Sequence, residues 1–503
     1  MASLLQLAIP AIPLWDLRSA PPRTVGGIAA AQERILARIL GGLRGTAVAR
    51  RFPLHDAAAF RANMPILQYA DLEPEIDRVV AGESDVLFKG RPVALAQTSG
   101  TTRDANASER YIPQTAALLR HHRRGGSAAL VRVLKQAPDV LGGRMLFLGG
   151  CTALDRRGAV PVGDLSGIAA ATLPRWISAS YEPGNVISAI PDWNQRLDAI
   201  AAHLRGRDVR LMSGIPAWLL MLLERIDAPL SKALPNLRAM IHGGHAVEPF
   251  IATLSGHLSG DTLMQEVYPA SEAFIAVGRA PWRLGDGTPS PLELLTNHGV
   301  YLEFAQDDGR VVGAHELQPG GIYRVLVTTP AGLLRYQVGD LIRAEGPGLM
   351  RFAGRVKTRI SVFGEHVEGM ALAAALQQAT RVTGARVAHY HVAPILPGPR
   401  EPRGAHEWWV EFASAPADPV AFTAAIDASL RAQVIDYAAH RDGGQLLSPV
   451  LRPVPGGTFH AYLAAKGHLG GQHKVPQAWP DRTIADHLAK YSSAESGHNT
   501  VKP

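Results

Sequence analysis

The sequence contains a single cysteine, Cys151, among 503 residues. One thiol excludes an internal disulfide and any zinc site built on cysteine, and it is typical of proteins from a reducing compartment. The N-terminal residues lack the charged-then-apolar build of a signal peptide, and no apolar run is long enough to span a bilayer. From these absences we expect a cytoplasmic protein that does not use the membrane as a partner.

A strong charge of one sign is also missing. Lys and Arg number 51 against 44 Asp and Glu, which gives a net charge of +7. The excess is spread thinly, and its local clusters at 120–124 and 400–403 are short and lack interleaved aromatic residues. The pattern therefore argues against nucleic acid as a partner. An anionic small substrate and a solvated basic surface explain the charge equally well.

Several common motifs of catalysis are absent. There is no Walker A motif, no Gly-x-Gly-x-x-Gly fingerprint, no Gly-x-Ser-x-Gly elbow and no His-Glu-x-x-His. His242 and His245, in the run His-Gly-Gly-His, have the residue type of metal ligands, but the flanking acid and the third ligand are not evident. We interpret this pair as part of a loop and not as a metal site.

What is present is an ordinary globular composition, with 47% hydrophobic residues, and a clear order of elements. Residues 25–49 have the apolar spacing of an amphipathic helix. From 195 to 267 helical and strand patterns alternate, which predicts parallel strands with helices on the faces. Short strand patterns take over from about residue 300, which predicts a meander or a small barrel.

The predicted fold class is therefore α/β with two domains. A large N-terminal α/β domain over 1–357 has a mostly parallel sheet and a β-rich subdomain. A smaller C-terminal α+β domain over 358–503 has two strands flanked by helices, a typical compact arrangement. We expect this smaller domain to be a mobile lid.

The stretch 97–113 organises the interpretation of function. An apolar strand pattern precedes it, and a helical pattern that opens at Gln114 follows it. Small hydroxyl residues around a glycine allow N–H and O–H groups to converge on an anion, as in a phosphate-binding loop. In isolation such a loop is more often a surface turn. The loop consists of Thr98, Ser99, Gly100, Thr101 and Thr102.

Further motifs follow in order along the chain. The run 268–272, Tyr-Pro-Ala-Ser-Glu, ends a strand pattern and offers a ring, a hydroxyl and a carboxylate able to ligate Mg²⁺. The run 334–340 ends in Gly339-Asp340, where the aspartate can accept both ribose hydroxyls and the glycine lets the sugar approach. Each run alone also fits an ordinary turn. The remaining motifs are Gly354-Arg355, Gly364-Glu365 and the late run Gln472-His473-Lys474-Val475-Pro476.

Together and in this order, these motifs resemble those of the adenylate-forming enzymes. Among them the chain is most similar to the auxin-conjugating acyl acid amido synthetases (the Gretchen Hagen family), in a short bacterial form. The resemblance extends from about residue 60 to 485. It implies a large domain that binds ATP and a carboxylic acid, and a smaller domain that rotates over it.

The resemblance also implies roles for individual residues. The phosphate loop is matched by Ser99, Gly100, Thr101 and Thr102. Tyr268 matches the aromatic residue at adenine, Ser271 matches a nucleotide-contacting hydroxyl, and Glu272 matches the Mg²⁺ ligand. Asp340 matches the ribose aspartate, Arg355 matches the hinge-proximal arginine, and Lys474 matches the catalytic lysine that reaches the α-phosphate. Candidates for the acyl pocket are Trp176 and the helix face Ile215, Trp218 and Leu222. An apolar stripe at that spacing is also typical of plain core.

The implied activity is ATP- and Mg²⁺-dependent adenylation of a small carboxylic acid, followed by acyl transfer to an amine or amino acid with release of AMP and pyrophosphate. Two alternatives stay open. The acceptor of the first is a thiol, on coenzyme A or on a separate carrier protein. The second is a catalytically silent protein that only binds ligand, and it is motivated by four departures from the family pattern, at 103–108, Ala270, Gln337 and Gln477.

Overall fold

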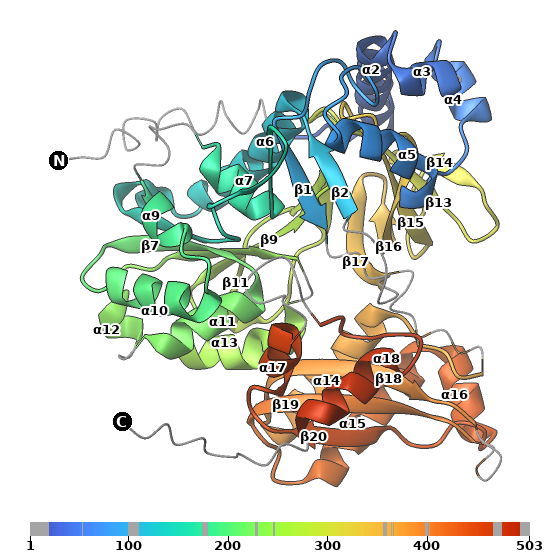
Figure 1. Cartoon of the computed structure of the whole chain (residues 1–503). Coiled ribbons are helices and arrows are strands. Elements are labelled where there is room, and N and C mark those ends of the chain that lie inside the picture. The colour runs from blue at the N-terminus through green and yellow to red at the C-terminus, as the bar shows by residue number, and fades with distance from the viewer. Residues whose placement is uncertain are drawn as a thin grey trace. The chain divides into compact units, whose positions relative to one another are not determined.

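The computed structural model (Figure 1) describes residues 20–52, 54–98, 110–173, 180–226, 230–244, 247–355, 360–363, 365, 367–397, 401, 403–465 and 475–492. These residues form two compact units. The first unit runs to Val247 and from His257 to Ala353, and the second consists mainly of residues from Gly354 onward together with Glu248–Gly256. None of the described helices is long and apolar enough to cross a bilayer.

Four helices open the first unit: α2 (Val25–Leu43), α3 (Ala47–Arg51), α4 (Ala57–Asn63) and α5 (Tyr69–Val80). Thr24 caps α2 by accepting a hydrogen bond from Gly27 N. The apolar positions that predicted this helix are all buried. The helix ends at Leu43, six residues before the predicted end, because the chain turns there into the separate helix α3.

A sheet of 13 strands forms the centre of the first unit, in the order β14-β13-β15-β16-β17-β12-β10-β9-β8-β7-β3-β6, with β11 (Trp282–Arg283) beside β9. One end of this order is parallel, as the alternating pattern predicted. The parallel strands are β3 (Arg144–Leu148), β6 (Tyr181–Glu182), β7 (Val209–Gly214), β8 (Ala239–Gly243) and β9 (Leu263–Pro269), and the helices between them include α10 (Trp193–His203) and α11 (Pro216–Arg225).

The other end of the sheet is an antiparallel meander, so the β-rich subdomain is confirmed as a meander and not as a small barrel. It continues the same sheet because β12 pairs with both β10 and β17. Its strands are β10 (Phe274–Gly278), β12 (Leu292–Leu294), β13 (Tyr301–Ala305), β14 (Val311–Gly313), β15 (Ile322–Thr328), β16 (Tyr336–Gly346) and β17 (Leu349–Arg355).

A smaller sheet of four strands, in the order β2-β1-β5-β4, corrects one prediction. β1 (Ala94–Thr98) pairs antiparallel with β2 (Arg110–Gln114), and helix α6 (Ala116–Leu134) begins only after Thr115. The hydroxyl-rich loop therefore connects two antiparallel strands and does not lead into a helix N-terminus. β5 (Val160–Gly163) and β4 (Asp155–Arg157) complete the sheet.

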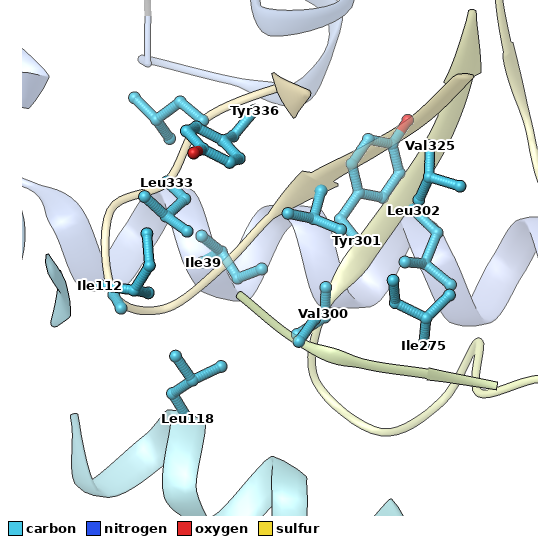
Figure 2. Close-up of a cluster of buried hydrophobic side chains, with 14 of the residues drawn as sticks. Ile39, Ile112, Leu118, Ile275, Val300, Tyr301, Leu302, Val325, Leu333 and Tyr336 are labelled. Carbon is cyan, nitrogen blue, oxygen red and sulfur yellow. The ribbon is translucent and has the colours of Figure 1, made fainter. Parts of the chain in front are cut away.

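One apolar core joins these elements of the first unit. Figure 2 shows Ile112 of β2, Leu118 of α6 and Ile275 of β10 in the same cluster as Tyr301 and Tyr336 of the meander. α6 also covers the parallel strands through a second cluster that includes residues of β7, β8 and β9. The small sheet, α6 and both ends of the large sheet are thus parts of one packed body.

The second unit has a three-stranded sheet in the order β18-β19-β20. β18 (Arg386–Ile395) and β19 (Ala405–Ser414) are the predicted pair, and β20 (Val450–Val454) adds a parallel third strand that the sequence did not reveal. Two separate helices follow β19, because α15 ends at Gln433 and α16 begins at Ile435. The helices are α14 (Gly369–Thr383), α15 (Pro419–Gln433), α16 (Ile435–Asp442), α17 (Thr458–Ala465) and α18 (Thr483–Ser492).

Candidate active site

The parallel strands of the first unit end at a common edge. β7, β8 and β9 run in the same direction, with Gly214 opposite His242 and Gly243 opposite Val267. Their carboxyl ends therefore lie side by side, which is where α/β sheets hold ligands. Tyr268 and Pro269 are the last residues of β9, so the run 268–272 lies at this edge, as predicted.

A tight turn carries this run from β9 into β10. Ala270 N donates to Ala273 O at 2.8 Å, and Phe274 lies opposite Pro269 where the two strands pair. Within the turn Ser271 is buried and Glu272 is half-buried. The Ser271 hydroxyl and the Glu272 carboxylate are thus carried by a short hairpin that is closed by the hydrogen bond from Ala270 N to Ala273 O.

Tyr268 and Asp340, which the resemblance assigns to adenine and ribose, contact each other. Tyr268 Oη donates to Asp340 Oδ2 at 2.5 Å, and the two residues are 72 positions apart in the chain. Both are buried. The Tyr268 ring also packs edge-on against Phe352, with ring centroids 5.6 Å apart. The fold therefore brings two of the predicted nucleotide-binding residues into one site.

A bulge in β16 places Asp340. The pairing of β16 with β15 is regular up to Gln337 and resumes at Leu341 with a shifted register, so extra residues of β16 leave the ladder. Gly339 lies in this bulge at a φ of +92°. Side chains with a Cβ rarely adopt that conformation, so the glycine of the Gly-Asp pair is needed for the backbone itself.

Arg335, the first residue of the run Arg-Tyr-x-x-Gly-Asp, has a structural role. Its guanidinium forms a bidentate ion pair with Glu303, at 2.7 and 3.0 Å, and the two side chains are only 6% and 4% exposed. It also donates to the carbonyl oxygens of Met64 and Arg61. Arg335 has a φ of +40°, so these contacts hold a sparsely populated conformation just before the strand that carries Asp340.

Glu272 acts electrostatically on Tyr336, the first residue of β16. Burial raises the pKa of the Tyr336 phenol, the charge of Glu272 raises it further, and the charge of Arg110 lowers it. Glu272 and Arg110 therefore both lie within electrostatic range of Tyr336. The Arg110 guanidinium also lies 5.0 Å from the ring centroid of Tyr69. Sequence analysis did not single out Arg110, because one arginine at the start of a strand carries no pattern.

Several predicted residues lie outside the described part of the chain. These are Ser99, Gly100, Thr101, Thr102, Trp176, His245, Gly364 and Lys474. Their roles stay predictions. The structure does place the residues on either side of the phosphate loop, since Thr98 lies opposite Arg110 in the β1–β2 ladder.

The acyl-pocket candidates Ile215, Trp218 and Leu222 extend from the N-cap of α11 into the helix. Ile215 is the half-buried N-cap residue, directly after the carboxyl end of β7. Trp218 is buried against Trp193 of α10, with ring centroids 5.0 Å apart. Leu222 is completely buried. Ile215 is thus the candidate at the carboxyl edge of the parallel strands, whereas Trp218 also packs α11 against α10.

His242 is the penultimate residue of β8. It is fully buried, and burial lowers its pKa to about 3. Its ring lies edge-on to Trp282, with centroids 6.4 Å apart. Among the described residues no group of three or more His, Cys, Asp or Glu side chains is arranged to hold a metal ion.

Two further motif residues belong to the second unit. Arg355 is exposed at the end of β17. Glu365 is buried, and its carboxylate accepts hydrogen bonds from Val362 N and Phe363 N, both at 2.8 Å, and lies 2.8 Å from His406 Nε2. Although burial opposes ionisation, these bonds lower the pKa of Glu365 to about 2. Glu365, the acid of the Gly-Glu motif, therefore holds the backbone at Val362 and Phe363.

Three domain models of one protein family match the chain in consecutive segments. The GH3 family N-terminal domain matches residues 26–223, the GH3 family central domain residues 293–354 and the GH3 family C-terminal domain residues 370–483. The chain belongs to the GH3 family of acyl acid amido synthetases. The resemblance seen in the sequence motifs is thereby confirmed at the level of the family, while the bacterial form stays a prediction.

Curated relatives agree with this membership, and a solved structure shares the fold. The indole-3-acetic acid-amido synthetase GH3.8 of Oryza sativa subsp. indica is 26% identical over 446 residues, 72% of this chain and 72% of that protein. The jasmonoyl–L-amino acid synthetase JAR4 of Nicotiana attenuata is 24% identical over 402 residues, 63% of this chain and 66% of that protein. The structure of the AtGH3.15 acyl acid amido synthetase in complex with 2,4-DB has a TM-score of 0.75 at 18% identity, covering 97% of this chain and 96% of that one.

In this GH3 chain the family motifs separate into two kinds. Tyr268 and Asp340 are brought into mutual contact, with Tyr268 at the carboxyl end of β9. Arg335 and Glu365 are instead bonded to other parts of the protein, with Glu303 and His406 as their charged or polar partners. The order of the motifs alone did not distinguish these structural residues from the candidate site residues, because Glu303 and His406 lie far from Arg335 and Glu365 in the sequence.

Proposed function

We propose that this chain joins a small carboxylic acid to an amine or amino acid at the expense of ATP. The observation that carries the proposal is the meeting of Tyr268 and Asp340 beside the turn that holds Ser271 and Glu272. An aromatic ring, a carboxylate proposed to bind ribose and a candidate metal ligand are thus close together in the first unit. Family membership supports the same assignment.

The proposed reaction has two steps. In the first, a carboxylate oxygen of the acid attacks the α-phosphorus of ATP, and the bond to the β-phosphate oxygen breaks to release pyrophosphate. In the second, the amine nitrogen attacks the acyl carbon of the mixed anhydride, loses a proton and displaces AMP. Negative charge accumulates on the α-phosphate in the first step, so fixed positive charge there lowers its barrier. We assign that role to Lys474.

Glu272 fits a magnesium site of the kind that uses few protein ligands. Mg²⁺ in nucleotide sites is commonly held by one or two carboxylates together with phosphate oxygens and water. Glu272 is a half-buried carboxylate on a hydrogen-bonded turn, close to the proposed nucleotide site. When bound, the ion would neutralise phosphate charge, and Glu272 would orient it from the protein side.

ATP–pyrophosphate exchange with a panel of carboxylic acids tests the proposed function. We expect exchange with at least one acid, and amide formation when amino acids or amines are added. Thioester formation with coenzyme A, and none with amines, would replace the amide assignment by the thiol alternative. The absence of exchange with every acid, in protein shown to be folded, would favour the silent binder.

Replacing Glu272 with alanine should weaken the dependence on Mg²⁺ without unfolding the protein. The side chain is half-buried and contributes little to the apolar core. We expect the Mg²⁺ concentration for half-maximal exchange to rise by about tenfold, as for loss of one charged ligand interaction of about 1.4 kcal/mol. A magnesium titration of both proteins measures this, and superimposable titrations would remove Glu272 from the metal site.

Replacing Asp340 with alanine should mainly raise the KM for ATP. Its proposed bonds to ribose exist in the ground state and in the transition state alike, so their loss leaves kcat nearly unchanged. Two hydrogen bonds to a charged group are worth roughly 1.5–3 kcal/mol each, which predicts a rise in KM of at least tenfold. Tyr268→Phe serves as the control, because it removes the hydroxyl that bonds Asp340 and keeps both the ring and the carboxylate. An unchanged KM in Asp340→Ala would identify Gly339-Asp340 as an ordinary bulge.

A further inference from the structure

We propose that Gln114, His121 and Gly125 are positioning residues for the nucleotide site. They hold the turn 270–274 from the side of β2 and α6, and with it the Ser271 and Glu272 side chains. The inference rests on the proposed function, because it assumes that this turn contacts ATP and its metal. None of the three residues is assigned a role by the family motifs, since they lie outside every motif quoted above.

Gln114 holds the first part of the turn. It is the last residue of β2 and is completely buried. Its side-chain Nε2 donates to Ser271 O at 2.9 Å, across 157 positions of sequence. Within the described part of the chain its Oε1 has no hydrogen-bond partner. Burying an amide oxygen without a hydrogen-bond donor lowers the stability of the folded protein. A requirement of the site for the bond to Ser271 O would explain why Gln114 is buried here despite this cost.

His121 holds the end of the turn. Phe274 N donates to His121 Nε2 at 3.0 Å. The ring proton is therefore on Nδ1, which lies 3.0 Å from His298 O and donates to it. Burial lowers the pKa of His121 to about 4, so the imidazole is neutral near pH 7 and Nε2 stays available as an acceptor. The hydrogen-bonded chain from Phe274 N to His298 O is thus complete only with a neutral histidine.

Gly125 lies one helical turn after His121, on the same face of α6. A Cβ at this position would come within 2.4 Å of Phe274 Cγ. The missing side chain therefore lets the Phe274 ring sit directly on the α6 backbone, although glycine inside a helix costs about 1 kcal/mol relative to alanine. The backbone N–H and the ring of Phe274 are held by two residues of one helix face.

The three contacts converge on a segment of five residues that carries two of the proposed nucleotide and metal contacts. Apolar packing supports them, because Ile112 of β2, Leu118 of α6 and Ile275 of β10 lie in the same cluster (Figure 2). A misplacement of about 1 Å at a reacting site can reduce the rate by a factor on the order of 10². The position of this turn decides how well Ser271 and Glu272 meet ATP and its metal, so we expect a displaced turn to raise the KM for ATP.

The adjacent glycines of α6 provide a matched test. Gly125→Ala should displace Phe274 and raise the KM for ATP by about tenfold. Gly126→Ala should leave the KM within about twofold and stabilise the helix, because nothing lies within 4 Å of its added Cβ. Equal KM values for the two variants would overturn the inference.

A second pair keeps the test decisive if Gly125→Ala does not fold. Gln114→Met removes the bond to Ser271 O while keeping the length of the side chain. Gln32→Met is its control, because Gln32 is also buried and bonds Thr296 O at 2.7 Å and Leu302 N at 2.7 Å, away from the turn. Both variants should lose stability, but only Gln114→Met should raise the KM for ATP, by roughly threefold to tenfold. A KM that rises equally in both would indicate a merely structural role.

Hydrogen exchange separates failure of this inference from failure of the proposed function, because it needs no activity. In His121→Leu the amide of Phe274 loses its acceptor, so peptides covering 270–276 should exchange faster than in the wild type. In His121→Gln an amide oxygen can take the place of Nε2, and protection should largely return. Unchanged exchange in His121→Leu would overturn the inference even if the wild type proves to be an active ligase.

Discussion

Replacing Lys474 with alanine is expected to slow acyl-adenylate formation by a factor on the order of 10²–10³, which is the usual cost of removing one fixed charge-stabilising group. The lysine is proposed to contact the α-phosphate only while charge develops there. Nucleotide binding should therefore change little. Acyl transfer from a pre-made acyl-adenylate should also be retained. In that step the amine attacks the acyl carbon and displaces AMP, so the α-phosphorus is no longer the atom attacked. Single-turnover measurement of each step on one preparation tests this directly.

Lys490→Ala is the control for this prediction. Lys490 is an exposed lysine of α18, in the same C-terminal part of the chain. Its removal should leave both steps unchanged. Equal losses in both steps for Lys474→Ala would point to a structural lysine, and full adenylation activity would exclude Lys474 from the reaction.

Replacing Glu303 with leucine is expected to have the largest effect on stability. The ion pair with Arg335 is almost completely buried, so its loss leaves a guanidinium charge without its counter-ion. Breaking one partner of a buried pair typically costs about 3–5 kcal/mol in the free energy of unfolding. Urea unfolding of wild type and variant measures the difference, with the m-value as a check that both unfold in the same way.

The exposed pair Arg61–Glu33 provides the comparison, because its side chains are 43% and 51% exposed. Glu33→Ala should cost less than about 1 kcal/mol. If Glu303→Leu were no more costly than Glu33→Ala, the burial of the Arg335 pair would not be energetically important. In that case the left-handed conformation of Arg335 would need another explanation.

Periodicity predicted the elements whose apolar residues follow one simple repeat. The alternation of helical and strand patterns from 195 to 267 is confirmed by the parallel strands β7, β8 and β9 and by the helices α10 and α11. β2 was missed because its five residues include Arg110 and Pro113, which do not read as a strand, and because it lies directly before a helix. β20 was missed for the same reason, since Pro453 and Arg452 interrupt its apolar pattern.

The candidate site was only partly accessible from sequence. The order of motifs selected Tyr268 and Asp340, and the fold brings them into contact. It could not show that Arg335 is bound by Glu303, 32 positions away, or that Gln114 bonds Ser271, 157 positions away. These contacts depend on which strands become neighbours in the sheet. That information is distributed over the whole chain and is not contained in any one motif.

The antiparallel pairing of β1 and β2 has a consequence for how freely the segment between them can vary in length. Residues 99–109 connect two strands whose register is fixed by five consecutive pairs, from Ala94 with Gln114 to Thr98 with Arg110. The entropy of closing a loop grows only with the logarithm of its length, so doubling or halving such a connection changes its free energy by about 0.6 kcal/mol. A change in the length of this connection, which includes the departure at 103–108, therefore costs the fold almost nothing. The register of β1 and β2 on either side can therefore stay the same when this connection changes in length.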